Sequence, residues 1–156
     1  MSDLKKLKQI AKGFSILYVE DNKALRENAS KLVHKIFDEV DVAANGFEGL
    51  EKFKRHHYPL VITDIKMPKM DGIIFASKIK KIEANTKVVI MSAFDDKEYL
   101  LKSIEIGIFR FLKKPVNLTE LIEVLSTAIH EAKHEHNTKL FYTYLKIYLT
   151  IKVLWF

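Results

Sequence analysis

The sequence predicts an α/β fold in which five parallel strands form one sheet with helices on both faces. Five short strand-like segments alternate along the chain with segments whose apolar residues recur at helical spacing. This alternation is typical of parallel sheets, because each helix returns the chain to the edge at which the next strand begins. The expected strands are residues 15–19, 39–43, 60–64, 87–91 and 109–112.

The segments between these strands carry the boundary signals of helices. Asn45 and Gly46 are turn residues that precede the second helical segment. Asp71 can cap free backbone amides at the start of the third helical segment, and Gly107 ends the fourth. The apolar residues of the fifth helical segment, which include Leu118, are expected to face the core. We expect helices over about residues 25–37, 47–53, 72–82, 95–106 and 117–136.

The two ends of the chain lie outside this pattern. Residues 1–14 permit either a short amphipathic turn or a frayed leader. In residues 137–156 apolar and polar residues alternate, which favours a strand, but Tyr144, Tyr148 and Lys152 also permit a helix that continues from residues 117–136. Both readings of this C-terminal extension stay open, and its role is unknown: it could be a truncated output segment, a docking element or an oligomer contact.

Composition narrows the class of protein. The 156 residues are 48% hydrophobic and 29% charged, which is typical of one globular domain. The absence of cysteine excludes disulfides and thiolate metal sites. The net charge of +6 lies mostly in the two ends, so the middle lacks the excess expected of a dedicated DNA-binding surface. No apolar run has the length of a signal peptide or membrane span, and we expect a cytoplasmic protein.

Three acidic residues follow two of the expected strands. Asp64 ends the strand at residues 60–64, and Glu20 and Asp21 follow the strand at residues 15–19. In open α/β sheets this carboxyl edge is where ligands bind. Clustered carboxylates need a cation, and oxygen ligands without cysteine or histidine suit a hard ion such as Mg²⁺.

Two further polar residues are expected at the same edge. Ser92 follows the strand at residues 87–91, and Lys114, before Pro115, follows the strand at residues 109–112. Carboxylates, a hydroxyl and an ammonium together suit a phosphoryl group that is transferred to a carboxylate.

With these residues in place, the sequence resembles the receiver domain of bacterial two-component response regulators over residues 15 to 130. The resemblance rests on Glu20-Asp21, Asp64 within TDIKMPKMDG, Ser92 before Ala93, and Lys114 before Pro115. It implies a flavodoxin-like strand order of 2-1-3-4-5 and makes residues 15–136 the receiver domain, between a leader and the C-terminal extension.

The resemblance also implies roles for the site. Asp64 would accept a phosphoryl group from a histidine kinase or phosphotransfer protein, and Lys114 would hold a phosphoryl oxygen. Mg²⁺ would be bound by Asp21, by Asp64, by Glu20 directly or through water, and by the backbone carbonyl of Lys66.

Phosphorylation is expected to change protein contacts at a distance from Asp64. Ser92 would bond the phosphoryl group, and Phe111 would fill the space that the hydroxyl leaves. This shift would alter the face made by residues 95–106, 109–112 and 117–136, which could bind a downstream protein or form a homodimer. Lys66 and Phe94 could hinder the water that hydrolyses the phosphorylated state.

Several other functions fit parts of the sequence. The chain could be the receiver of a DNA-binding transcriptional regulator whose output domain is missing. A haloacid-dehalogenase-type phosphatase also uses an aspartate after a strand, but Lys66 stands where that family has a second acid. A dinucleotide-binding oxidoreductase would need glycines where Glu20 and Asp21 stand.

One metal motif competes with the receiver interpretation. His130, Glu131 and His134 spell H-E-x-x-H, a zinc metalloprotease pattern when it lies on a helix. Both histidines are expected on the solvated face, opposite the apolar stripe, where a charged helix surface is the simpler explanation.

Overall fold

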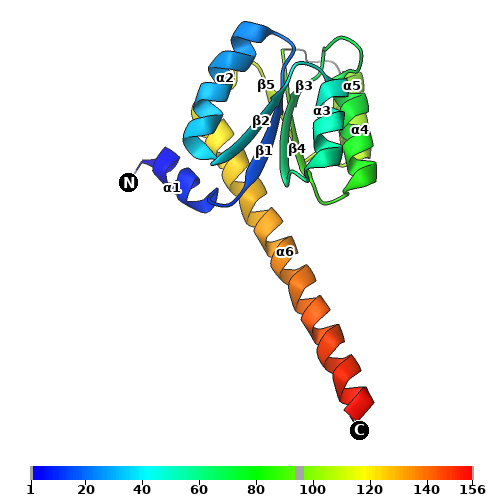
Figure 1. Cartoon of the computed structure of the whole chain (residues 1–156). Coiled ribbons are helices and arrows are strands. Elements are labelled where there is room, and N and C mark those ends of the chain that lie inside the picture. Colours follow the sequence, from blue (N-terminus) through cyan, green and yellow to red (C-terminus); the bar gives the residue numbers. More distant parts are fainter. Residues whose placement is uncertain (1, 94–96, 156) are drawn as a thin grey trace.

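A computed structural model describes residues 2–93 and 97–155, with side chains up to residue 152, and shows one parallel sheet (Figure 1). The strand order is β2-β1-β3-β4-β5, which confirms the expected fold class and order. Strand β4 ends one residue later than expected, and β5 both begins and ends one residue later. The strands are β1 Ser15–Val19, β2 Glu39–Ala43, β3 Leu60–Asp64, β4 Lys87–Ser92 and β5 Arg110–Lys113.

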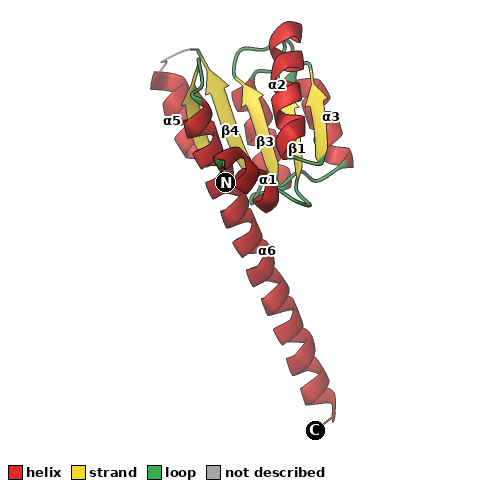
Figure 2. Ribbon diagram, turned by 90° about the vertical axis from the view of Figure 1, so that its left-hand side faces the viewer, coloured by secondary structure: helices red, strands yellow, loops and turns green. Residues whose placement is uncertain are grey.

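Helices cover both faces of the sheet (Figure 2). The apolar sides of α1, α2 and α6 pack on one face, and those of α3, α4 and α5 pack on the other. Side chains of β1, β3 and β4 alternate between these two cores, which is why their sequences are apolar at successive positions. The helices are α1 Asp3–Ile10, α2 Lys23–Ile36, α3 Gly46–Arg55, α4 Gly72–Ile82, α5 Lys97–Ile106 and α6 Leu118–Trp155.

Four of the described helices begin at side-chain caps. Asn22, Asn45, Asp71 and Asn117 each accept a hydrogen bond from the backbone amide three residues later. These caps satisfy amides that have no partner within the helix and place the start of each helix beside the carboxyl edge of the sheet. The expected start of α5 near Asp95 lies outside the described residues.

The amino-terminal residues belong to the core. Leu7 and Ala11 are fully buried in the same cluster as Ala128 and Ile129 of α6. Helix α1 therefore packs against α6, and residues 3–10 adopt the amphipathic helical alternative rather than a frayed leader. The side chain of Leu118, which we expected to face inward, is half exposed.

The last helix is much longer than the expected end at residue 136. Helix α6 is 38 residues long, so the helical alternative for the C-terminal extension is the one the chain adopts. Residues 137–152, here called the projecting segment, are all exposed and extend away from the domain (Figure 1). No helix in the described part of the chain is long and apolar enough to cross a membrane.

The start of α4 depends on a close approach of two backbone segments. The Gly72 amide donates to the carbonyl of Ile65 at 2.8 Å, and a Cβ atom on Gly72 would lie 1.9 Å from the carbonyl oxygen of Asp64. A side chain of any size would therefore displace the end of β3. Glycine is therefore needed at position 72 to keep Asp64 in place at the end of β3, and not only to form the turn before α4.

We expect Gly72→Ala to lower the free energy of unfolding by about 3 kcal/mol or more, since the added methyl group must move backbone atoms. The control is Gly13→Ala, at which the residue has φ +79° and nothing lies within 4 Å of the added methyl group. Backbone strain alone makes that change cost about 1–2 kcal/mol. Urea unfolding followed by circular dichroism compares the two, and equal losses would contradict the steric argument.

Candidate functional site

Three carboxylates meet at the carboxyl edge of the sheet. Glu20 and Asp21 directly follow β1, and Asp64 is the last residue of β3, the neighbouring strand. One oxygen atom from each of the three side chains lies within 4.8 Å of the others. In the described part of the chain no other group of three acidic or histidine side chains is close enough to hold a metal ion.

Lys114 supplies the positive charge that the cluster requires. Its Nζ atom lies 2.8 Å from Oε2 of Glu20 and 3.1 Å from Oδ2 of Asp64. The side chain enters from the end of β5, and its backbone amide donates to the carbonyl of Ser92 at 2.8 Å. The structure thus brings Lys114 to the carboxylates, while the neighbouring Lys113 is exposed.

The contacts of Lys114 stabilise its charged form. Burial acts to lower the pKa of this ammonium, but the hydrogen bonds to Glu20 and Asp64 outweigh burial, so the pKa is raised above its ordinary value. The ammonium therefore stays protonated across the neutral range.

The loop after β1 is held by backbone and side-chain contacts. The Glu20 carboxylate is only 2% exposed, and its Oε1 atom accepts from the Asn22 amide at 3.1 Å. Nη1 of Arg26 donates to the backbone carbonyls of Glu20 at 2.7 Å and Asp21 at 3.1 Å. Arg26 was not predicted from the sequence, because its only signal there is a basic residue shortly after the acidic pair.

A second set of contacts fixes Asp64. Its Oδ1 atom accepts from the Ile65 amide at 2.7 Å, and the Thr63 hydroxyl donates to the Asp64 carbonyl at 2.9 Å. The carboxylate is 16% exposed, which leaves it reachable from solvent at the edge of the sheet. Asp64 is therefore held in one orientation without being enclosed.

Tyr18 lies next to the same cluster and was not singled out from the sequence. Burial is the largest cause that raises the pKa of its phenol, and the charges of Glu20 and Asp64 raise it further. This phenol therefore remains neutral beside the carboxylates.

The other expected site residues lie around this cluster. Ser92 is fully buried at the end of β4, and Phe111 is partly buried, opposite Ile90 in the β4–β5 register. Lys66 follows Asp64 in an exposed position. Phe94 lies outside the described residues, so the idea that Lys66 and Phe94 hinder water stays a prediction.

The zinc motif does not form a comparable site. His130 and His134 are exposed on α6, as expected from the helical pattern. Neither belongs to a group of three metal-ligating side chains in the described ranges 2–93 and 97–152. The three residues of the motif are therefore part of a charged helix surface.

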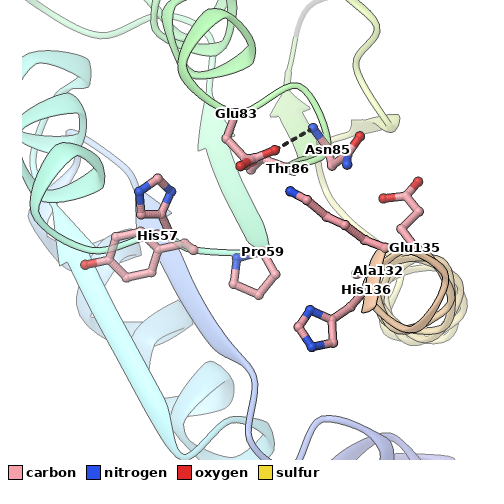
Figure 3. Close-up of a pocket in the computed structure, with 10 residues that line it drawn as sticks. His57, Pro59, Glu83, Asn85, Thr86, Ala132, Glu135 and His136 are labelled. Carbon is pink, nitrogen blue, oxygen red and sulfur yellow. Dashed lines mark hydrogen bonds between the residues drawn. The ribbon is translucent and has the colours of Figure 1, made fainter. Parts of the chain in front are cut away.

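A pocket of about 260 Å³ lies at the opposite edge of the sheet (Figure 3). Pro59 and Thr86, which precede β3 and β4, face His136 of α6 across it. Beside this pocket Lys87 pairs with Glu131 at 3.3 Å and with Glu135 at 2.7 Å. These ion pairs attach α6 to the amino end of β4, so the contacts here are structural.

The fold and this edge define a doubly wound α/β protein with an acidic cluster and a paired lysine. The sequence model of the response regulator receiver domain family matches residues 16–126. The chain therefore belongs to this family, whose members act in two-component signalling and are not classical enzymes. The phosphatase and oxidoreductase alternatives are thereby superseded.

Individual relatives support the same assignment. The chemotaxis protein CheY of Bacillus subtilis is 33% identical over 116 residues, which cover 74% of this chain and 97% of CheY. A solved N-terminal domain of a Wolinella succinogenes protein is 36% identical, with a TM-score of 0.74 and coverage of 79% of this chain and 99% of that domain. A Clostridium thermocellum receiver domain is 31% identical, with a TM-score of 0.71 and coverage of 77% and 97%.

Other relatives are longer than this chain. An uncharacterized response regulatory protein of Staphylococcus epidermidis is 31% identical over 130 residues, which are 80% of this chain and 51% of that protein. The chain thus spans about half the length of this relative. The receiver family interacts with kinases or phosphotransfer proteins and with downstream targets.

The acidic cluster should make the metal-free protein less stable than a neutralised variant. We expect Asp21→Asn to raise the free energy of unfolding by about 0.5–1 kcal/mol in chelator-containing buffer, because it removes repulsion among three close carboxylates. Asp38→Asn, at an exposed position away from the cluster, is the control and should have a smaller effect. Urea unfolding in the presence of EDTA checks this expectation, and a less stable Asp21→Asn chain would contradict it.

Removing the Lys114 charge should have the opposite effect. We expect Lys114→Met to lower the free energy of unfolding at pH 7 by about 1–3 kcal/mol, because Glu20 and Asp64 lose their cation. The exposed control Lys113→Met should cost less than about 1 kcal/mol.

The pH dependence follows from the raised pKa of Lys114. Its contribution is fully present below the unfolded value of 10.5 and is lost as the pH rises through the higher folded value. The stability difference between wild type and Lys114→Met should therefore stay constant from pH 7 to about pH 9 and shrink above about pH 10.5. A stability difference that shrinks between pH 7 and pH 9 would show that Lys114 loses its proton in that range, which would contradict a raised pKa.

Proposed function

We propose that Asp64 accepts a phosphoryl group from a histidine kinase or phosphotransfer protein, and that phosphorylation changes the protein contacts of this chain. The observation that carries the proposal is the double contact of Lys114 with Glu20 and Asp64 at the carboxyl edge. This arrangement offers a carboxylate nucleophile beside a fixed positive charge, as phosphoryl transfer to an aspartate requires.

In the proposed reaction an Oδ atom of Asp64 attacks the phosphorus of a phosphohistidine. The new bond joins that oxygen to phosphorus while the bond from phosphorus to the donor imidazole nitrogen breaks, and the imidazole regains a proton. Lys114 is placed to turn from the carboxylates to an oxygen of the incoming phosphoryl group. The backbone contact at Oδ1 leaves Oδ2, now beside Lys114, as the better-placed nucleophile.

The residues present fit a Mg²⁺ ion. Three carboxylates and no soft ligand form the cluster, which is the donor chemistry of a hard cation. Asp21 and Asp64 would hold the ion with the Lys66 backbone carbonyl, and Glu20 would act directly or through water because its carboxylate is buried and already paired with Lys114. Bound Mg²⁺ would supply positive charge to the phosphoryl oxygens.

Phosphorylation would change the shape of the face made by α5, β5 and α6. Ser92 would bond the phosphoryl group, and Phe111 would move toward the space that its hydroxyl vacates. Leu100, Leu101 and Ile104 of α5 are between 46% and 68% exposed, which supports a protein-binding role for this face. The partner would be a downstream protein or a second copy of the chain.

A DNA-binding output is the second candidate. The transcriptional regulatory protein HptR of Staphylococcus aureus is 29% identical over 119 residues, which cover 74% of this chain but only 46% of HptR. A receiver of this kind can therefore be part of a protein about twice its length. Salt-dependent DNA binding by the full gene product would support this candidate.

We expect the native chain to gain one phosphoryl group when incubated with acetyl phosphate and Mg²⁺, and Asp64→Asn to gain none. Intact mass spectrometry measures the gain, and Asp38→Asn should be phosphorylated as the wild type is, because this exposed residue lies away from the cluster. Chelation with EDTA should abolish the gain in every variant. Phosphorylation of a folded Asp64→Asn chain would exclude Asp64 as the acceptor.

A further inference from the structure

The projecting segment carries more exposed apolar surface than any other part of the described chain. Its large side chains are between 39% and 64% exposed and contact no other element, because the helix extends beyond the domain (Figures 1 and 2). A contiguous apolar surface of this kind marks an interaction site. These side chains are Leu140, Phe141, Tyr142, Tyr144, Leu145, Ile147, Tyr148, Leu149 and Ile151.

A narrow polar stripe runs along the same helix. Lys139, Thr143, Lys146 and Thr150 follow one another at spacings of four, three and four residues, which places them on one side of an α-helix. The hydroxyls of Thr143 and Thr150 donate to backbone carbonyls four residues earlier, at 2.9 Å in each case. Outside this stripe the segment is apolar or aromatic apart from Asn137, Thr138 and Lys152.

Charge in this part of the chain has one sign. After Glu135 the sequence contains no acidic residue, and its charged residues are Lys139, Lys146 and Lys152. The Nζ atom of Lys152 lies 6.0 Å from the ring centre of Tyr148, so the ammonium lies over the face of this exposed aromatic ring. The segment therefore combines apolar, aromatic and cationic side chains without any anion.

We propose that the projecting segment binds the surface of an anionic lipid bilayer. The wide apolar side would enter the boundary between headgroups and acyl chains, and Lys139 and Lys146 of the polar stripe would lie at headgroup level. Lys152 is on the apolar side, and its long side chain would carry the ammonium up to the headgroups. Lysines near an anionic membrane surface each strengthen binding, which makes the missing acidic residues significant.

Pairing of two copies fits this segment less well. A two-helix seam covers only a narrow stripe of each helix and would leave much of the apolar circumference in water. The seam opposite the polar stripe would run through Phe141, Leu145 and Tyr148 to Lys152, where two copies would bring like charges together. No acidic residue of the segment could pair with the lysines of a partner copy.

The adjacent end of the domain carries further positive charge. The side chains of Lys5, Lys6, Lys8 and Lys12, in and just after α1, are exposed. Lys6 lies 3.4 Å from Asp3, and Asp38 lines a shallow pocket with Lys5, Lys8 and Lys12, so four lysines stand against two acidic residues here. Helix α1 packs on α6 near the point where α6 leaves the domain (Figure 1). Basic charge therefore continues from the projecting segment onto the domain.

The test is flotation of the full chain with vesicles of phosphatidylcholine alone and of phosphatidylcholine mixed with phosphatidylglycerol. We expect binding to the mixed vesicles that weakens at high salt, and much weaker binding to phosphatidylcholine alone. The triple variant Lys139→Glu, Lys146→Glu, Lys152→Glu should lose at least about tenfold in binding. A matched triple reversal at the exposed Lys31, Lys35 and Lys78 changes the net charge equally and should bind almost as the wild type does.

A second variant tests the apolar contribution. Phe141→Gln with Tyr148→Gln keeps helix-forming residues and all three lysines, and should also lose about tenfold in vesicle binding. Both positions lie outside the core, so thermal unfolding of the domain should be unchanged. Equal binding to both vesicle types, or no vesicle binding together with a dimer in light scattering that the Gln variant disrupts, would overturn the proposal.

Discussion

Repulsion among three carboxylates at one edge of the sheet is the constraint around which this domain is built. Glu20, Asp21 and Asp64 come from adjacent parallel strands, so the sheet brings their charges together irrespective of any local preference. Lys114 offsets part of that repulsion through two contacts and thereby links the end of β5 to the ends of β1 and β3. Such an arrangement lowers the stability of the fold, as is typical of sites that bind a charged ligand.

The surrounding structure keeps this edge in place with backbone contacts. Arg26 holds the carbonyls of the acidic pair, the Ile65 amide holds Asp64, and Gly72 allows α4 to start against the end of β3. None of these contacts uses the carboxylate oxygen that faces Lys114. The chain thus fixes the orientation of the site, and these contacts leave free the Asp64 oxygen that we propose as the phosphoryl acceptor.

Helix α6 connects the domain to the surface that we assign to membrane binding. Its first half is buried against the sheet through Leu125 and Ile129 and is attached to β4 by the ion pairs of Lys87. Its second half is the projecting segment. Since the two halves form one continuous helix, a shift of the packed half on phosphorylation would also move the membrane-binding half.

The sequence by itself determined the fold class and most of the acidic site. The central strands β1, β3 and β4 were predictable because buried parallel strands are short apolar runs. Glu20, Asp21 and Asp64 were predictable because they stand at the carboxyl ends of two of these runs. The pairing of Lys114, rather than Lys113, with Glu20 and Asp64 was inferred from the resemblance, and its contact distances come from the tertiary structure. Arg26 could not be recognised, because its role is to hold backbone carbonyls, which leave no pattern in side-chain sequence.

Only the tertiary structure decided the state of the two ends. The apolar residues near the amino terminus could not show that they pack on α6, because a short stripe has no partner until the fold supplies one. In residues 137–156 the alternation that favours a strand coexists with helical spacing, and local pattern cannot choose between them. The chain continues as a helix there because α6 is already nucleated by its packed half, and extending an existing helix avoids the cost of starting a new element.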